Sequence, residues 1–416
     1  MAGYHTNQLA LGGKKCDVDL FFTLTQSVFY TQSQAGKNHW ADICIMEWKA
    51  PILKSVYEVK APASRPIRAK AIRNPLGNVT ETVNKLADGS MLHIFTATNS
   101  PQMFPEPDMP PAYTQVQNIR LSTAASWREI SKWYWDLCVP HLEKTNAAMT
   151  NKVAELKGTL KGEALVRAVF KFVSQEIRYM GLTMEDTSPG YAPHDVDVTF
   201  DNRYGVCRDK AGLLVAMLRI AGVEAFPVLI NVGAKMDKEV PQPYFNHAIV
   251  AAQLNGKYIL MDPTNENTKD IFPAYLSNKS YLVCRKEGEE LMTTPVPPSA
   301  DNAVIATSRG RLSDDGVMMI ENKIDFLGVN DTIYRGALAR RTPEERNRLF
   351  ERIVARFSAG AEMLSCEIEP EDMRDTEKPL SVKIVSRIPE AALKGRTQIE
   401  LLTPMVSKAF GYVNFL

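Results

Sequence analysis

The dipeptide Asn255-Gly256 stands between two apolar runs of the chain. Asn-Gly in such a setting is the strongest short-range signal for a β-hairpin, because both residues accept the positive φ of a two-residue turn. A two-residue loop places Leu254 opposite Lys257 and thereby sets every other pair of the ladder. The pattern predicts two antiparallel strands whose register is fixed by their turn.

This register brings a histidine and a carboxylate together on one face of the hairpin. His247 falls opposite Thr264, and Asp262 falls opposite Ile249. Side chains of a strand alternate between two faces, so His247 and Asp262 are diagonal neighbours on the same face, about 7–8 Å apart at the backbone. A shift of one residue would put them on opposite faces, so their pairing depends on the register.

A cysteine upstream stands at the start of a predicted helix. Apolar residues recur at helical spacing over about 207–220, and Gly222 follows where a helix commonly ends. The unpaired N–H groups and the positive dipole at the helix start favour a thiolate at Cys207 and can also hold an oxyanion. The alternative is a structural cysteine, which would more often lie in the middle of a helix among aliphatic side chains.

Cys207, His247 and Asp262 have the order and the roles of a Cys-His-Asp constellation. The aspartate holds one tautomer of the imidazole, the imidazole takes the thiol proton, and the thiolate attacks a carbonyl carbon. Asp262 taken alone fits equally well as the start of the Asp-Pro turn that ends its strand. His194 is a rival base, but it lies in a loop rich in proline and aspartate without a defined face.

The other ionisable residues near the cysteine give no further chemistry. Asp209 and Lys210 are expected to be structural, because the helix dipole favours a carboxylate in the first turn. The acidic positions between residues 185 and 201 lack the fixed spacing of an EF-hand calcium loop. We therefore expect neither a metal nor another cofactor.

Four blocks of sequence surround these residues. They are Tyr-Gly-Val-Cys-Arg-Asp-Lys-Ala (204–211), Ala-Gly-Val-Glu-Ala-Phe-Pro-Val (221–228), Phe-Asn-His-Ala-Ile-Val (245–250) and Asp-Pro-Thr (262–264). In order and spacing they resemble the transglutaminase-like superfamily, and most of all its bacterial members with a β-rich domain of unknown function before the core and another after it. The resemblance implies an α+β, papain-like core, in which the helix bearing Cys207 packs on an antiparallel sheet bearing His247 and Asp262, flanked by two β-rich, sandwich-like domains.

The resemblance also implies a side chain that helps to bind the oxyanion. Many members present a tryptophan before the cysteine, whereas this chain has no tryptophan between residues 136 and 416. Tyr191 is the candidate to replace it, with Tyr179 and Gln175 ranked after it. For each of the three, the alternative is a role in packing or on a helix surface.

The chain is long enough for two to three domains. We expect a β-rich N-terminal domain over 1–115, the transglutaminase-like domain over 120–295 and a β-rich C-terminal domain over 300–416, with proline-rich connectors between them. Alternating apolar residues predict a strand over 18–24, and residues 411–416 read as a strand cut short.

Capping and breaking signals predict further elements. Ser126 with Glu129 begins one helix, and residues 161–178 carry the apolar stripe of a second. Thr342 caps the one helix expected in the C-terminal domain. Pro227 limits the strand after the cysteine helix to a sheet edge, or itself to an early position in that strand.

Composition describes a folded protein without a strong charge bias. Hydrophobic residues make up 45% and charged residues 23% of the 416 residues, and the net charge is +1. This balance excludes a nucleic acid or an anionic membrane held by bulk electrostatics, and no apolar run approaches the roughly 20 residues of a membrane span. Six scattered cysteines favour neither a disulfide scaffold nor structural zinc. Residues 1–13 lack the features of a signal peptide, while the resemblance allows a site outside the cytoplasm.

These features predict an acyl-transfer enzyme that acts on an amide bond of a peptide, a protein or a peptidoglycan-type substrate. The family resemblance favours hydrolysis, as by a peptidase or amidase, over cross-linking. The polar segment 233–243 is expected to be a mobile flap beside the site. The alternative is a protein whose β domains bind a glycan, a peptide or a partner protein, with the core as a scaffold. An intact triad speaks against that alternative, because a binding module has no need of one.

Overall fold

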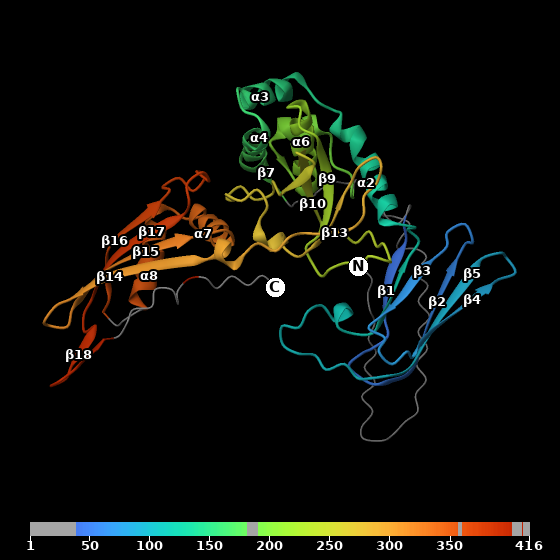
Figure 1. Cartoon of the computed structure of the whole chain (residues 1–416), viewed down its shortest axis with the longest axis horizontal. Coiled ribbons are helices and arrows are strands. Elements are labelled where there is room, and N and C mark those ends of the chain that lie inside the picture. Colours follow the sequence, from blue (N-terminus) through green and yellow to red (C-terminus); the bar gives the residue numbers. More distant parts are fainter. Residues whose placement is uncertain (1–38, 181–189, 357–359, 402–409, 411–416) are drawn as a thin grey trace.

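The computed structural model describes residues 39–180, 190–356, 360–401 and 410. Figure 1 shows three units along the chain: blue and cyan strands, a green and yellow core of helices and strands, and an orange and red C-terminal unit. The core lies between the other two units. The predicted α+β fold class, a core flanked by two β-rich units, is confirmed.

From residue 39 on, the N-terminal unit has six strands. They are β1 (Ala41–Ile45), β2 (Ile52–Ala61), β3 (Arg68–Ile72), β4 (Val79–Lys85), β5 (Met91–Ser100) and β6 (Asn118–Ser122). They form two antiparallel sheets, ordered β1-β6-β3 and β2-β5-β4, around buried side chains such as Met46, Phe95 and Leu121. The proline-rich stretch after residue 100 connects β5 to β6, so it is a loop inside this unit, and it holds only the short 3-10 helix η1 (Ala112–Thr114).

In its described residues, the central unit combines five helices with a five-stranded antiparallel sheet. The helices are α2 (Trp127–Leu142), α3 (Ala147–Lys157), α4 (Gly162–Glu176), α5 (Val196–Asn202) and α6 (Cys207–Ile220). The strands are β7 (Arg178–Tyr179), β8 (Tyr204–Gly205), β9 (Ala225–Asn231), β10 (His247–Leu254), β11 (Lys257–Met261), β12 (Ser280–Val283) and β13 (Met292–Thr293), with the 3-10 helix η2 (Ala274–Leu276) before β12. The sheet has the order β11-β10-β9-β12-β13, and α6 packs against β10 and β9.

The predicted hairpin is confirmed together with its register. Leu254 of β10 lies opposite Lys257 of β11. Asn255 and Gly256 both have positive φ, 51° and 75°, as a two-residue turn of this hand requires. Because β10 is buried on both faces, a shifted register would have to repack the whole sheet.

Pro227 was predicted to lie either in an edge strand or early in its strand, and the structure has it early in its strand. β9 is a central strand, and Pro227 is its third residue, opposite Val250. Its carbonyl accepts from the N–H of Cys284, one residue beyond the end of β12. The N–H and C=O of one residue point to the same side of an antiparallel strand, so the missing N–H faces a position where β12 has already ended.

The C-terminal unit joins a four-stranded antiparallel sheet and a small hairpin with two helices in its described part. Its elements are η3 (Ser299–Asn302), β14 (Val304–Leu312), β15 (Met318–Phe326), α7 (Val329–Ala339), α8 (Pro343–Ala355), β16 (Glu362–Glu369), β17 (Ser381–Ile388), β18 (Ala392–Lys394) and β19 (Ile399–Leu401), and the large sheet is ordered β14-β15-β17-β16. The prediction of a single helix here is wrong. α7 follows Gly328 without a side-chain cap, and its buried residues include polar ones such as Asn330 and Asp331.

The helices with capping or periodic signals are confirmed within two residues at each end. The side chain of Ser126 accepts from the N–H of Glu129 at the start of α2, and Thr342 and Glu345 form a complete capping box on α8. The helix predicted over 161–178 is α4, and the one predicted over 207–220 is α6. α3 and α5 are further helices that no prediction covered.

Some predictions concern residues outside the described ranges. These are the strand over 18–24, the features of residues 1–13 and the cut strand over 411–416. Among the residues that the structure does describe, no helix combines the length and the apolar character of a membrane span.

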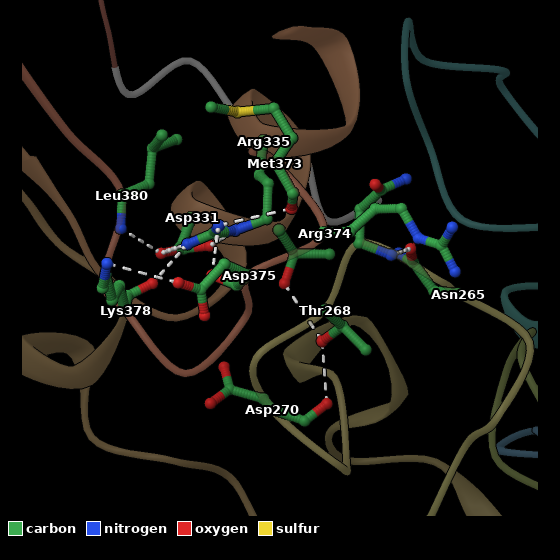
Figure 2. A network of polar contacts seen from close by, with 12 residues as sticks. Asn265, Thr268, Asp270, Asp331, Arg335, Met373, Arg374, Asp375, Lys378 and Leu380 are labelled. Atoms are coloured by element: carbon green, nitrogen blue, oxygen red, sulfur yellow. Dashed lines mark hydrogen bonds and ion pairs between the residues drawn. The ribbon is translucent and has the colours of Figure 1, made fainter. Parts of the chain in front are cut away.

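A buried arginine holds the C-terminal unit together where this unit meets the core (Figure 2). Arg335 is completely buried, and its guanidinium donates to both oxygens of Asp331, at 2.7 and 3.0 Å. It also donates to the carbonyls of Met373, Asp375 and Lys378. A buried guanidinium needs such complete pairing, because an isolated charge in the interior is strongly unfavourable.

The same region contacts the loop that follows β11. The hydroxyl of Thr268 in that loop lies 3.3 Å from the hydroxyl of Thr332 on α7. On the other side of the contact, Arg374 donates to the side chain of Glu176 at 2.8 Å. The C-terminal unit therefore supports both the loop after β11 and the end of α4.

Replacing Asp331 by alanine leaves Arg335 buried without its counter-charge. We expect this change to lower the free energy of unfolding of the C-terminal unit by about 3–5 kcal/mol. Circular dichroism in increasing urea would detect it as an early transition. Glu321→Ala is the matched control, because it breaks an exposed cross-strand pair with Lys383 that water already screens. Equal losses in the two variants would contradict the role given to Asp331.

Candidate active site

Cys207 is the first residue of α6, and the turn before it is closed by Asp209. Asp209 Oδ2 accepts the N–H of Val206 at 3.0 Å, which caps the helix. Gly205 is required at its position, because a Cβ there would lie 2.7 Å from the Cβ of Asp209. This close packing fixes the point at which the helix begins, and so it fixes Cys207 at the helix N-terminus.

His247 and Asp262 lie side by side, as the hairpin register predicts. His247 is the first residue of β10, and Asp262 directly follows β11. His247 Nε2 donates to Asp262 Oδ2 at 2.9 Å, and the Asp262 residue is completely buried. The other ring nitrogen, Nδ1, is therefore the one available to Cys207.

Two residues that were not predicted to belong to the site complete the surroundings of Asp262. Oδ1 accepts from the backbone N–H and the hydroxyl of Thr264, at 3.0 and 2.7 Å. Oδ2 accepts from the hydroxyl of Tyr275 at 2.5 Å. Burial raises the pKa of a carboxyl, but the bonds from His247, Thr264 and Tyr275 outweigh burial and lower the pKa of Asp262. Asp262 is therefore held as a carboxylate.

The pKa of Cys207 is lowered from that of an ordinary thiol. Burial alone would raise it, but the hydrogen bond and charge of His247, together with the N–H groups of Ala248 and Arg208, stabilise the thiolate more strongly. Burial also disfavours the imidazolium of His247, yet the bond to Asp262 and the charge of Cys207 raise the pKa of His247 to about 10. The lowered pKa of Cys207 and the raised pKa of His247 both favour a thiolate–imidazolium pair at neutral pH.

The geometry does not support Tyr191 as the oxyanion residue. Its hydroxyl donates to the carbonyl of Pro243 at 2.6 Å and lies 3.1 Å from that of Phe245. Its ring packs edge-on against Trp133 and Tyr134. A tyrosine has one hydroxyl proton, and here it is committed to the backbone, so Tyr191 is a packing residue.

Of the two other candidates, Gln175 lies away from the site and Tyr179 lies beside it. Gln175 donates to the carbonyls of Glu266 and Arg374, at the contact with the C-terminal unit. Tyr179 borders the site and is partly exposed. Burial raises the pKa of Tyr179, and the negative charges of Cys207 and Asp262 raise it further, which is evidence that the tyrosine lies near both groups.

His194, Asp209 and Lys210 have structural partners. His194 Nδ1 lies 3.0 Å from Asp209 Oδ1, in a second His–Asp pair on the first turn of α6. Lys210 is completely buried and donates to the carbonyls of Ser174 and Ile177 at the end of α4. It thereby ties α6 to the segment that leads into β7, which carries Tyr179.

A cavity of about 280 Å³ lies beside the histidine. It is lined by Tyr179, Val232, Asn246, His247, Thr264 and Tyr275. A larger cavity, of about 490 Å³, lies along α7 and α8 in the C-terminal unit and is lined by none of these residues. No group of three or more metal-ligating side chains occurs among the described residues; positions 185 and 186 lie outside them.

The segment 233–243 lies against the N-terminal unit. Lys70 of β3 pairs with Asp237 at 3.1 Å and with Glu239 at 2.8 Å, and the side chain of Gln242 donates to two carbonyls of that unit. The indole N–H of Trp127 on α2 donates to a carbonyl of the same segment. The structure therefore does not support the predicted mobile flap, because ion pairs and hydrogen bonds hold this segment against the N-terminal unit and α2.

Residues 148–263 match the family model described as the transglutaminase-like superfamily. The structure is similar to one from Parabacteroides distasonis described as a "putative protease", with 13% sequence identity, a TM-score of 0.45 and coverage of 90% of this chain and 72% of the other. It is also similar to a "putative cysteine protease" from Cytophaga hutchinsonii, with 12% identity, a TM-score of 0.24 and coverage of 54% and 74%. No curated protein matches the chain.

A helix that begins with Cys207 and a sheet that carries His247 beside Asp262 define an α+β protein with a papain-like arrangement. Residues 148–263, which include all three side chains, match the transglutaminase-like superfamily, and the predicted resemblance is confirmed. This match supports a cysteine-based enzyme in the broad sense.

The lowered pKa of Cys207 predicts rapid alkylation by iodoacetamide at neutral pH, followed by peptide mass spectrometry. In His247→Gln we expect the rate at pH 7 to fall roughly 30-fold, because a thiol with a pKa of about 8.5 is only slightly ionised there. Four other cysteines serve as internal controls because burial raises the pKa of each: Cys44, Cys138, Cys284 and Cys366.

Cys16 lies outside the described residues and is best removed as Cys16→Ser in every chain compared. If Cys207 reacted with the pH dependence of an ordinary thiol both with His247 present and in His247→Gln, the thiolate–imidazolium pair would be excluded.

Proposed function

We propose that the protein is a cysteine-dependent acyl-transfer enzyme that cleaves amide bonds, with Cys207 as nucleophile, His247 as acid and base, and Asp262 orienting the histidine. The observation that carries the proposal is the 2.9 Å bond from His247 Nε2 to a fully buried Asp262. It leaves Nδ1 toward the cysteine whose pKa is lowered by the same histidine. This is the pairing that activates a thiol nucleophile.

The reaction begins with attack of the Cys207 thiolate on the carbonyl carbon of the substrate. The carbonyl π electrons move to oxygen and give a tetrahedral oxyanion. His247 then gives its Nδ1 proton to the amide nitrogen, the oxyanion re-forms the carbonyl as the C–N bond breaks, and the amine leaves. The acyl group remains on Cys207 as a thioester. Water attacks the thioester carbonyl while His247 takes a proton from it, and the second oxyanion re-forms the carbonyl as the C–S bond breaks, which releases the carboxylic acid and returns the thiolate.

The backbone at the start of α6 and Tyr179 are the proposed donors to the oxyanion. Unpaired N–H groups at a helix N-terminus point toward a developing negative charge. Tyr179 borders the cavity beside His247, and its raised pKa keeps its hydroxyl protonated. Tyr179 therefore takes the place that the family resemblance assigns to a tryptophan.

Hydrolysis of a peptide, a protein or a peptidoglycan-type substrate is the proposed outcome. The cavity of about 280 Å³ is at the lower limit of small-molecule sites, so it suits a side chain of an extended substrate better than a large separate ligand. Cross-linking would need an amine to replace water at the thioester. The family resemblance is the reason for preferring water.

The alternative function is binding by a flanking unit. The observation in its favour is that most of the chain lies outside residues 148–263, in the two β-rich units on either side of the matched core. A thiol of ordinary reactivity at Cys207 would favour this alternative.

Peptide cleavage tests the proposal directly. A mixture of synthetic peptides and purified peptidoglycan stem peptides should release new amino groups in the presence of the wild-type chain. Cys207→Ser and His247→Gln should reduce release to background, because neither chain can form the thiolate pair. Release by Cys207→Ser equal to that of the wild type would rule out the proposed nucleophile.

Tyr179→Phe removes one oxyanion donor and keeps the ring. We expect kcat to fall by about 10²–10³-fold, the usual effect of losing one such donor, while iodoacetamide still alkylates Cys207 at the wild-type rate. Tyr204→Phe, on the neighbouring strand β8, is the matched control and should leave kcat unchanged. A parallel loss of alkylation and turnover in Tyr179→Phe would assign this tyrosine to the thiolate instead.

A further inference from the structure

Tyr275 adds a partner to Asp262 that a Cys-His-Asp triad does not require. It lies in η2, and its side chain lines the cavity beside His247. Its hydroxyl donates to Asp262 Oδ2 at 2.5 Å, the same oxygen that accepts from His247 Nε2 at 2.9 Å. Two donors therefore meet on one oxygen atom.

We propose that Tyr275 is a positioning residue that competes with His247 for Asp262 Oδ2 and thereby limits how tightly the aspartate holds the imidazolium. The inference rests on the proposed function, because it gives Tyr275 an influence on the proton transfers of His247. Tyr275 itself touches neither the nucleophile nor the substrate carbonyl in this scheme.

The two oxygens of Asp262 have different partners. The partners of Oδ1 orient the carboxylate, whereas Tyr275 changes the negative charge on Oδ2. Oδ1 is fixed by Thr264, through its backbone N–H and its hydroxyl. With the bond from His247, this already orients the carboxylate. The bond from Tyr275 falls on the oxygen that faces the imidazole, where a hydroxyl donor withdraws negative charge from the contact with the ring.

This competition has a chemical consequence for the acid step. His247 must give its Nδ1 proton to the leaving amine, and an imidazolium held too strongly by a buried carboxylate resists that transfer. Tyr275 stays protonated, because burial and the charge of Asp262 raise its pKa above the usual range of a tyrosine. The hydroxyl therefore keeps its proton and donates it to Asp262 at neutral pH.

Other titratable groups lie near Tyr275, His247 and Asp262, and any test has to separate their titration from that of His247. They come from α6, β7 and the loop after β11, and they are Cys207, Lys210, Tyr179 and Glu266. Burial lowers the pKa of Lys210 to about 8, so this lysine also titrates at alkaline pH. The pH dependence of the reaction rate alone would combine the titrations of Lys210 and His247, so the titration of His247 has to be observed directly.

Nuclear magnetic resonance of the imidazole groups measures that titration in the full chain. Cys207→Ser removes the thiolate, so the pKa of His247 then reports on Asp262 and Tyr275, and His247→Gln identifies the signal among the six histidines. Adding Tyr275→Phe should raise the pKa of His247 by about 0.5–1 unit, a part of the effect of one hydrogen bond to a charged group.

Tyr258→Phe is the matched control. Tyr258 lies in β11, on the hairpin that leads to Asp262, but its hydroxyl bonds to Glu289 and Arg285. We expect this control to leave the pKa of His247 unchanged. An unchanged or lowered pKa in Tyr275→Phe would overturn the inference, even if the variant lost thermal stability, because that result describes a purely structural tyrosine. The titration needs no nucleophile, so failure of the proposed function is detected separately, by alkylation of Cys207 in the wild-type chain.

Discussion

The hydrogen bond between His247 and Asp262 depends on the carboxylate of Asp262, which is completely buried. A buried carboxylate is unfavourable unless donors satisfy both of its oxygens, and those donors have to come from the protein. Here they come from β10, from the turn after β11 and from η2, three segments that only the folded core brings together. The carboxylate in turn keeps His247 charged, and the charge of His247 lowers the pKa of Cys207.

The two β-rich units border the segments on either side of this bond. The N-terminal unit holds the chain that enters β10 at His247, through the ion pairs of Lys70 with the segment 233–243. The C-terminal unit contacts the loop that leaves Asp262, through Thr332 of α7. The flanking units therefore support the strand ends that carry the histidine and the aspartate, so they have a structural part in the site whatever else they bind.

The sequence was sufficient where one local rule decided the structure. Asn255-Gly256 set the register that joins His247 to Asp262, and the helical pattern placed Cys207 at the start of α6. It was insufficient where distant contacts decided. Tyr275 reaches Asp262 from the short 3-10 helix η2, α7 begins without a side-chain cap, and the segment 233–243 is fixed by a lysine of another unit. Tyr191 looked suitable as an oxyanion donor only while the backbone partners of its hydroxyl were unknown.

Covalent trapping of the acyl group on Cys207 tests the proposed chemistry most directly. The full chain would be mixed with a cleaved peptide, quenched in acid within milliseconds to seconds, and analysed by mass spectrometry of its proteolytic fragments. We predict an acyl adduct on the fragment that contains Cys207, released by hydroxylamine and absent in Cys207→Ser. Substrate cleavage without any adduct on Cys207, or an adduct on another residue that persists in Cys207→Ser, would contradict a thioester mechanism at this cysteine.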